Sequence, residues 1–231
     1  MCDAPLPPRD QSDTFLYAKQ PRRFNSDGTQ HNQYYGFSNR DIPYCGIKRS
    51  SSTFMTPLSI VIDLDNTLIF ASTSPVTISD FVIKVLVAPG KYEACYIHKR
   101  PDLEQFLSDI SKIANLYLYT ASTREYCEQI LSNIDPFGKY FKKVLCREDC
   151  IQDSNGSYIK DISKLKLDCT RTLIIDNDRF AYGKEKVNSN LLPIIPYFGD
   201  YKDCELSKMF RLITSYSNAK DVRAYIMQRN P

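Results

Sequence analysis

The sequence predicts an α/β domain with three layers, in which a mostly parallel sheet is covered on both faces. From residue 58 onward, short apolar segments typical of buried strands alternate with amphipathic segments typical of helices. Three of the strand segments end in polar side chains: IVIDLD (60–65), LYLYTAS (116–122) and LIIDND (173–178). Ligands of such sheets bind beyond the carboxyl ends of the strands, so we expect these side chains to converge on one site.

The individual elements follow from periodicity and turn residues. We expect strands at 58–63, 115–120, 142–146, 171–176 and 192–196, and a hairpin over 80–98 that turns at Pro89 and Gly90. Helices are expected at 101–114, with Pro101 in the first turn, at 122–134, with Ser122 or Thr123 as the cap, and at 203–216. Asn155 and Gly156 mark a tight turn. The hairpin is therefore a small insertion in an otherwise alternating pattern.

Residues 1–57 differ from the rest of the chain in composition. They hold six of the thirteen prolines and no valine. A segment with so few aliphatic residues cannot bury enough apolar surface to offset its chain entropy. We therefore predict a largely disordered N-terminal extension over 1–57 and one domain over 58–231.

Charge and composition exclude several classes of function. The net charge of +3, from 30 basic and 27 acidic residues, is too small to favour nucleic acid or an anionic membrane as the main partner. No segment has the apolar length of a membrane-spanning helix, and the N-terminus lacks a signal-peptide pattern, so we expect a soluble protein of the nucleus or cytoplasm. The eight cysteines include no CxxC pair and the chain has two histidines, which favours reduced thiols over a zinc site.

The pair Asp63 and Asp65 indicates a cation site. Strand alternation places both carboxylates on one side of the chain, where they repel each other unless a cation or proton separates them. Mg²⁺ accepts carboxylate and carbonyl oxygens, and a third ligand is available in the cluster of Asp176, Asn177 and Asp178.

The same residues can perform phosphoryl transfer. An aspartate beside Mg²⁺ can attack phosphorus to form an aspartyl phosphate, and a second carboxylate two residues on can protonate the leaving alkoxide and then activate water. Developing charge on the phosphoryl group calls for cations and hydrogen-bond donors. Thr120 and Ser122 offer hydroxyls, and Lys160 offers a fixed positive charge.

Six motifs carry a resemblance to a known family. DLDNTL at 63–68 resembles the DxDxT signature of haloacid-dehalogenase-type phosphatases. KRPDLEQFL, YTAS, CREDC, YIKDISKL and IIDN follow in the order found in the small C-terminal-domain phosphatases, the FCP/SCP or NLI-interacting-factor-like family. The resemblance spans about residues 58 to 215 and leaves the first 57 residues outside it.

The resemblance implies a role for each matching residue. Asp63 would be the nucleophile, Asp65 the general acid and base, Thr120 a phosphoryl ligand and Lys160 the balancing charge. Asp63, the Asp65 carbonyl, Asn177 and Asp176 would hold Mg²⁺, with Thr67 and Ser122 beside the substrate, and Val85 and Val87 would form an apolar pocket for a proline near the phosphorylated residue. The family dephosphorylates phosphoserine or phosphothreonine in proteins, notably the repetitive tail of RNA polymerase II, and the chain would act as a monomer.

Two motifs depart from the family pattern. Asn66 replaces the usual glutamate, and Asp178 and Arg179 replace a Ser-Pro pair, which adds negative charge near the metal site. This second departure keeps open the alternative of an idle domain that serves as a binding or scaffold module. A further alternative is a phosphatase of small metabolites.

The spacing of the motifs argues against a lid domain. Only 52 residues separate Thr67 from Thr120, and 37 separate Ser122 from Lys160, and the expected strands and helices use most of both. Enzymes of this superfamily that act on small metabolites generally cover the site with a cap. We therefore expect an open site that admits a phosphorylated residue on an extended chain.

Overall fold

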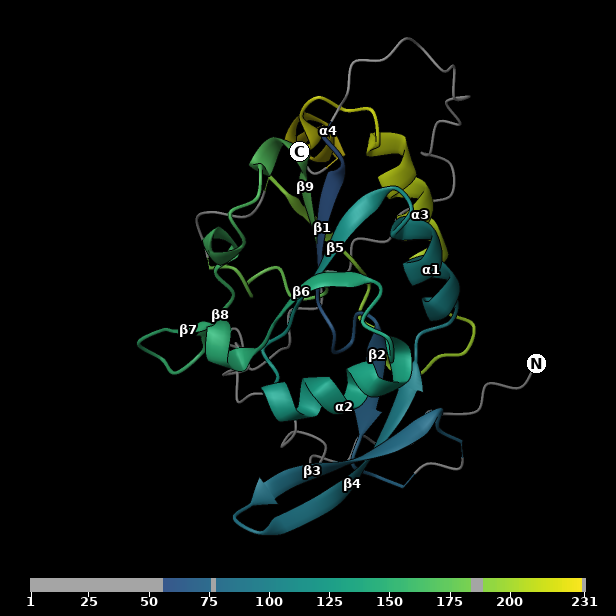
Figure 1. Ribbon diagram of the computed structural model, residues 1–231, viewed down its shortest axis with the longest axis vertical. Helices are drawn as coiled ribbons and strands as arrows, with labels where there is room; N and C mark the ends of the chain where they lie inside the picture. Colours follow the sequence, from purple (N-terminus) through teal and green to yellow (C-terminus); the bar gives the residue numbers. More distant parts are fainter. Residues whose placement is uncertain (1–55, 76–77, 184–188, 230–231) are drawn as a thin grey trace, which may run out of the picture.

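The computed structural model describes residues 56–75, 78–183 and 189–229 (Figure 1). Five parallel strands form the central sheet in the order β10-β9-β1-β5-β6. Their bounds are β1 Leu58–Ile62, β5 Ala114–Tyr119, β6 Phe141–Leu145, β9 Thr172–Asp176 and β10 Leu191–Pro193. This confirms the predicted parallel sheet. Most of the extension predicted over 1–57 lies outside the described residues, so that assignment stays a prediction.

Four α-helices lie among the described residues: α1 Leu103–Ile110, α2 Arg124–Ile134, α3 Glu205–Tyr216 and α4 Val222–Arg229. The Thr123 side chain caps α2 by accepting a hydrogen bond from the Tyr126 N–H at 3.4 Å. Thr123 is one of the two residues predicted as the cap. Helix α1 is shorter than predicted, because it begins at Leu103 after Asp102 adopts a left-handed backbone, and Pro101 lies before the helix. Helix α4 was not predicted from the pattern.

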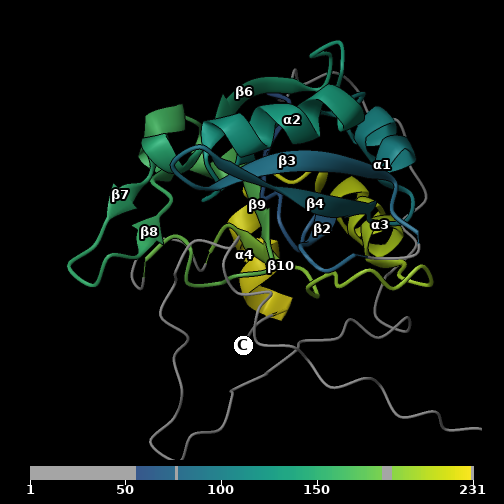
Figure 2. The same ribbon diagram turned by 90° about the horizontal axis from the view of Figure 1, so that it is seen from below.

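The two faces of the central sheet are covered differently. Figures 1 and 2 show α1 and α3 on one side of β1 and β9 and the segment with β7 Ile151–Gln152 and β8 Tyr158–Ile159 on the other. The described residues also form three short 3₁₀ helices, η2 Arg147–Asp149, η3 Ile162–Leu165 and η4 Cys169–Arg171. Ile162 and Leu165 of η3 pack against the core of the second face, to which no α-helix contributes a residue among those described. The three layers are present, with a thinner cover on this face than on the first.

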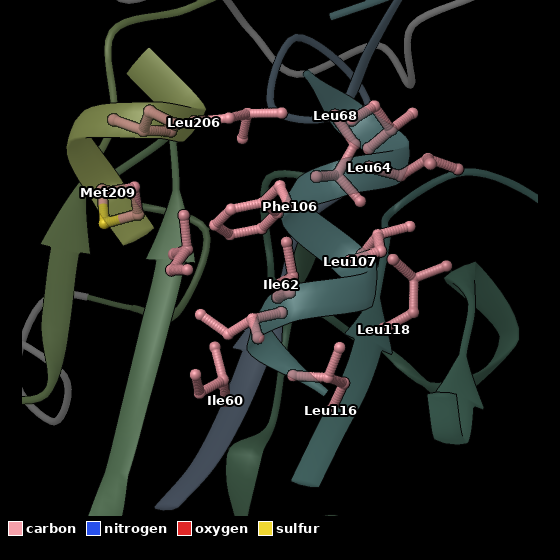
Figure 3. Close-up of a cluster of buried hydrophobic side chains, with 14 of the residues drawn as sticks. Ile60, Ile62, Leu64, Leu68, Phe106, Leu107, Leu116, Leu118, Leu206 and Met209 are labelled. Carbon is pink, nitrogen blue, oxygen red and sulfur yellow. The ribbon is translucent and has the colours of Figure 1, made fainter. Parts of the chain in front are cut away.

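Strand alternation sends neighbouring residues of β1 into two separate cores. Ile60 and Ile62 enter the larger core, which all four α-helices help to form, whereas Val61 enters the smaller one. Figure 3 shows part of the larger core, where side chains of α1 and α3 pack on the sheet: Phe106, Leu107, Leu206 and Met209 against Ile60, Ile62, Leu116 and Leu118. Each of these aliphatic and aromatic side chains contributes about 1.5–3 kcal/mol by leaving water.

The predicted hairpin is confirmed and belongs to a second sheet. Strands β3 Phe81–Ala88 and β4 Lys91–Lys99 pair antiparallel, and β2 Ile69–Ser72 joins the other edge of β4. Apart from this small sheet and the β7–β8 turn at Asn155 and Gly156, the described residues contain no inserted domain over the strand ends. None of the described helices has the length and apolarity to cross a membrane. The six described cysteines form no disulfide.

Candidate active site

Asp63 lies just beyond the carboxyl end of β1, at the edge predicted from the sequence. Its N–H donates to the Ile175 carbonyl of β9 at 2.9 Å, which fixes its backbone between the two strands. The Lys160 Nζ lies 2.6 Å from Asp63 Oδ1 and 2.6 Å from Asp176 Oδ2, and all three side chains are buried. The structure thus brings together the predicted nucleophile and the predicted balancing charge.

The electrostatics of this cluster favour an additional cation. Burial raises the pKa of Asp63 to about 7, the nearby Asp176 and Asp65 add to the rise, and Lys160 opposes it. Burial also acts to lower the pKa of Lys160, but Asp176 and Asp63 outweigh that effect and raise it above its usual value, so the ammonium group stays charged. Two carboxyl groups contact the one ammonium group and a third, that of Asp65, lies near Asp63, an imbalance of charge that a divalent cation would relieve.

The Asp65 carboxyl group is bound by hydroxyl groups and not by Lys160. The Ser122 Oγ donates to Asp65 Oδ2 at 2.7 Å, and the Thr120 Oγ1 lies 3.4 Å from the same oxygen. The Tyr126 hydroxyl donates to Asp65 Oδ1 at 2.7 Å. Burial raises the pKa of Asp65, while the hydrogen bonds from Tyr126 and Ser122 act in the opposite direction. These hydrogen bonds fix the Asp65 carboxyl group beyond the carboxyl end of β1.

Tyr126 is a site residue that the sequence pattern did not reveal. Its spacing within α2 indicated only an inward-facing core residue, and its ring does pack in the larger core. The sequence feature that could have indicated this role is the position of Tyr126. It follows Ser122 by four residues, at the start of a helix that begins beside the strand ends. An inward-facing tyrosine there has a hydroxyl within reach of the acidic edge.

Oxygen atoms suited to Mg²⁺ converge around Asn177. One terminal atom of its side-chain amide lies 3.2 Å from Asp63 Oδ2 and 3.1 Å from the backbone oxygen of Asp65. Without a metal, a nitrogen at that position donates to both oxygens. An amide oxygen at that position would face these two oxygens without a hydrogen between them, an arrangement that a bound cation would stabilise. A carboxylate, a carbonyl and an amide oxygen form a donor set that fits Mg²⁺. Thr67 Oγ1 lies 3.0 Å from the same amide atom, so Thr67 supports Asn177 here.

Asp176 and Asp178 both accept hydrogen bonds from protein groups. Asp176 Oδ2 faces Lys160, and its Oδ1 accepts the Asp178 N–H at 2.8 Å, so both oxygens bind protein groups. Asp178 Oδ1 accepts the Phe180 N–H at 2.8 Å and supports its own turn. Among the described residues no three Asp, Glu, His or Cys side chains group as a metal site, so the metal fit depends on the Asp65 carbonyl and Asn177.

The Asn66 departure has a local explanation. Asn66 adopts φ +58°, in the left-handed region that asparagine tolerates better than most residues. Its side-chain nitrogen donates to the Tyr197 carbonyl at 2.8 Å, and its carbonyl accepts the Tyr197 N–H at 2.7 Å. The substitution therefore fits the turn that follows Asp65.

A groove of about 1270 Å³ lies next to Asp65. Ser122 and Tyr126, which bind the Asp65 carboxylate, also line this groove. The predicted substrate residues Val85 and Val87 line its wall on β3, with Val85 buried and Val87 37% exposed. Residues of α2 and β8 and the side chain of Arg147 also line the groove. The site is open to a large substrate along this groove.

The fold and the acidic strand ends define a domain of the haloacid-dehalogenase type. A solved structure of Fcp1, an essential RNA polymerase II CTD phosphatase, aligns with a TM-score of 0.53 and 26% identity over 73% of this chain and 52% of that chain. A variant of the fission yeast Fcp1 bound to beryllium fluoride aligns with a TM-score of 0.52 and 24% identity over 75% of this chain and 54% of that chain, which shows the fold alone.

Residues 58–223 match the family model of NLI interacting factor-like phosphatases, and the chain belongs to this family. It is 33% identical over 174 residues to the human carboxy-terminal domain RNA polymerase II polypeptide A small phosphatase 1, covering 75% of this chain and 65% of that protein. It is 34% identical over 172 residues to the Dictyostelium discoideum CTD small phosphatase-like protein 2, covering 74% of this chain and 30% of that protein. The chain thus spans less than two thirds of the length of both relatives.

Proposed function

We propose that this chain is a Mg²⁺-dependent protein phosphatase that hydrolyses phosphoserine or phosphothreonine through an aspartyl phosphate on Asp63. The observation that carries the proposal is that two neighbouring carboxyl groups, those of Asp63 and Asp65, have different binding partners. Asp63 is bound by the ammonium group of Lys160, whereas Asp65 is bound by the hydroxyl groups of Ser122 and Tyr126. Two carboxyl groups in different environments suit a nucleophile and a proton carrier.

The two residues act in sequence. A carboxylate oxygen of Asp63 attacks phosphorus, the bond from phosphorus to the serine or threonine oxygen breaks, and Asp65 donates its proton to that oxygen. Asp65 then takes a proton from water as the water oxygen attacks phosphorus, which breaks the bond to Asp63 and releases phosphate. Lys160 orients Asp63 and offsets charge on the transferred group, and Thr120 offers a hydroxyl to its oxygens.

Mg²⁺ would be held by Asp63, the Asp65 carbonyl and Asn177. The metal supplies charge stabilisation for the phosphoryl oxygens. Asp176 was also expected as a ligand; since Lys160 occupies one of its oxygens, we propose that it positions the lysine.

The open groove supports a protein substrate over a small metabolite. Phosphorylated tails, of which the RNA polymerase II tail is the example named in the relatives, would enter along the wall that carries Val85 and Val87. Such a substrate would place the enzyme in the nucleus or cytoplasm.

The direct test is turnover of an artificial aryl phosphate with and without Mg²⁺. We expect Mg²⁺-dependent release of phosphate by the wild type and none above background by Asp63→Asn. Asp65→Asn should lose several orders of magnitude in kcat, because both proton transfers depend on it, each worth roughly 10²–10⁴-fold. Full activity after chelation, or in Asp63→Asn, contradicts the proposal, and a wild type without any turnover favours the idle binding module.

A further inference from the structure

Strand β3 is an edge strand, and its outward-facing backbone groups can be identified. In the small sheet of order β2-β4-β3, β4 is central and β3 has one free side. The Asp80 N–H donates to the Ile97 carbonyl at 2.9 Å, so Ile97 directs its backbone groups toward β3. Ile97 pairs with Phe81, and backbone direction alternates along a strand, so Phe81, Ile83 and Val85 face β4. The N–H and C=O groups of the even-numbered residues therefore face the free edge.

Helix α2 confirms this direction and blocks part of the edge. Figures 1 and 2 both show α2 beside β3. The Lys84 N–H donates to the Gln129 side-chain oxygen at 3.2 Å, and the Gln129 side-chain nitrogen donates to the Lys84 carbonyl at 2.9 Å. The amide of Gln129 thus replaces one residue of a neighbouring strand. Lys84 cannot pair with another chain while this contact holds.

The next outward-facing residue, Leu86, opens on the groove. Four consecutive residues of β3, from Val85 to Ala88, line the groove, and α2 lines it with residues that include Gln129. Because successive side chains of a strand point to opposite faces, a groove lined by consecutive strand residues is also in contact with the strand's backbone. The groove continues to Ser122 and Tyr126, which bind Asp65.

Several charged side chains around the groove are already engaged with the protein. Lys91 pairs with Glu93 at 2.6 Å. The Arg147 Nε donates to the Ala121 carbonyl at 2.8 Å, and Glu148 accepts the Arg124 N–H at 3.1 Å. On the side of the groove formed by β3, the backbone N–H and C=O of Leu86 can therefore form hydrogen bonds with a ligand.

We propose that the substrate polypeptide binds in extended form along the free edge of β3, with one of its residues hydrogen-bonded to the backbone N–H and C=O of Leu86. This inference rests on the proposed function and adds how the enzyme holds a protein chain. Main-chain pairing recognises an extended peptide without reading its sequence. Gln129 limits the pairing to one residue, because it occupies the preceding outward position at Lys84. Phosphorylated sugars and aryl phosphates lack the backbone for this contact.

The first experiment changes the substrate and leaves the enzyme intact. A phosphoserine peptide is N-methylated at one backbone position at a time, and kcat and KM are measured with wild-type enzyme. Loss of one hydrogen bond should raise KM roughly threefold to tenfold. We expect this rise at a single position on one side of the phosphoserine, with both neighbouring positions tolerant. Equal effects at consecutive positions, or none at any position, overturn the proposal.

The second experiment removes the donor from the protein. Proline is tolerated in edge strands where its nitrogen faces outward, so Leu86→Pro removes the N–H, whereas Leu86→Ala keeps it. Val82→Pro is the matched control, because Val82 also faces the free edge but does not line the groove. The ratio of kcat/KM for the peptide to kcat/KM for an aryl phosphate should fall roughly threefold to tenfold in Leu86→Pro alone.

Two results separate this inference from the proposed function. If the wild type hydrolyses both substrates and the ratio is the same in Leu86→Pro, Leu86→Ala and Val82→Pro, the pairing at Leu86 is wrong and the phosphatase assignment stands. If the wild type hydrolyses neither substrate, the proposed function fails and the pairing fails with it.

Discussion

At the scale of single residues, the hydroxyl groups around Asp65 decide how well its carboxyl group is aligned. The Tyr126 hydroxyl is one of three that approach the carboxylate, and it comes from a helix whose start is fixed by the Thr123 cap. Tyr126→Phe removes this donor and keeps the ring in the core. Hydrogen bonds to charged groups contribute about 1.5–3 kcal/mol, so we expect kcat for an aryl phosphate to fall roughly tenfold or more.

The remote exchange Tyr225→Phe on the exposed side of α4 serves as the control and should leave kcat at the wild-type value. Equal kcat in Tyr126→Phe and wild type, at equal thermal stability, would show that Asp65 does not depend on Tyr126.

At the scale of elements, Arg100 joins the end of β4 to the loop before α3. Its side chain is fully buried, donates to both carboxylate oxygens of Asp203 at 2.8 and 2.7 Å, and donates to the Thr67 carbonyl at 3.0 Å. Asp203→Ala leaves this guanidinium group buried without its counter-charge. We expect a loss of about 3–5 kcal/mol in the free energy of unfolding, measured by urea denaturation.

The neighbouring pair Lys99 and Glu104 offers a matched control, because the Glu104 side chain is 59% exposed. Glu104→Ala should cost no more than about 1 kcal/mol, as exposed ion pairs contribute little. Similar losses in both variants would mean that burial does not set the importance of the Arg100 pair.

At the scale of the whole molecule, a metal at the strand ends would stabilise the fold. Its proposed ligands come from the segment after β1 and the segment after β9, so the cation would tie together two parts of the sheet edge. Binding to the folded state alone adds about 2.7 kcal/mol at a hundredfold excess over Kd. We expect Mg²⁺ to raise the melting temperature of the wild type and to have little effect on Asn177→Ala. The exposed Asn218→Ala serves as control and should respond like the wild type.

How much the sequence could predict differs between the fold and the site. The parallel sheet and the hairpin were predictable because burial on one or both faces imposes a period on local sequence. The strand ends placed Asp63 and Asp176 at one edge for the same reason. Contacts between distant residues leave no such local pattern: Lys84 and Gln129 are 45 positions apart, and Tyr126 and Asp65 are 61 apart. The contact of Asp176 with Lys160 was equally hidden, since the two residues are 16 positions apart.

Trapping the covalent intermediate would show directly whether Asp63 accepts the phosphoryl group. A radiolabelled phosphopeptide is mixed with enzyme and Mg²⁺ and quenched in acid within the first turnover, and the digested protein is searched for label. We expect label on the peptide that contains Asp63 in wild-type enzyme and none in Asp63→Asn. Rapid turnover without covalent label, or label on another residue, would contradict this expectation.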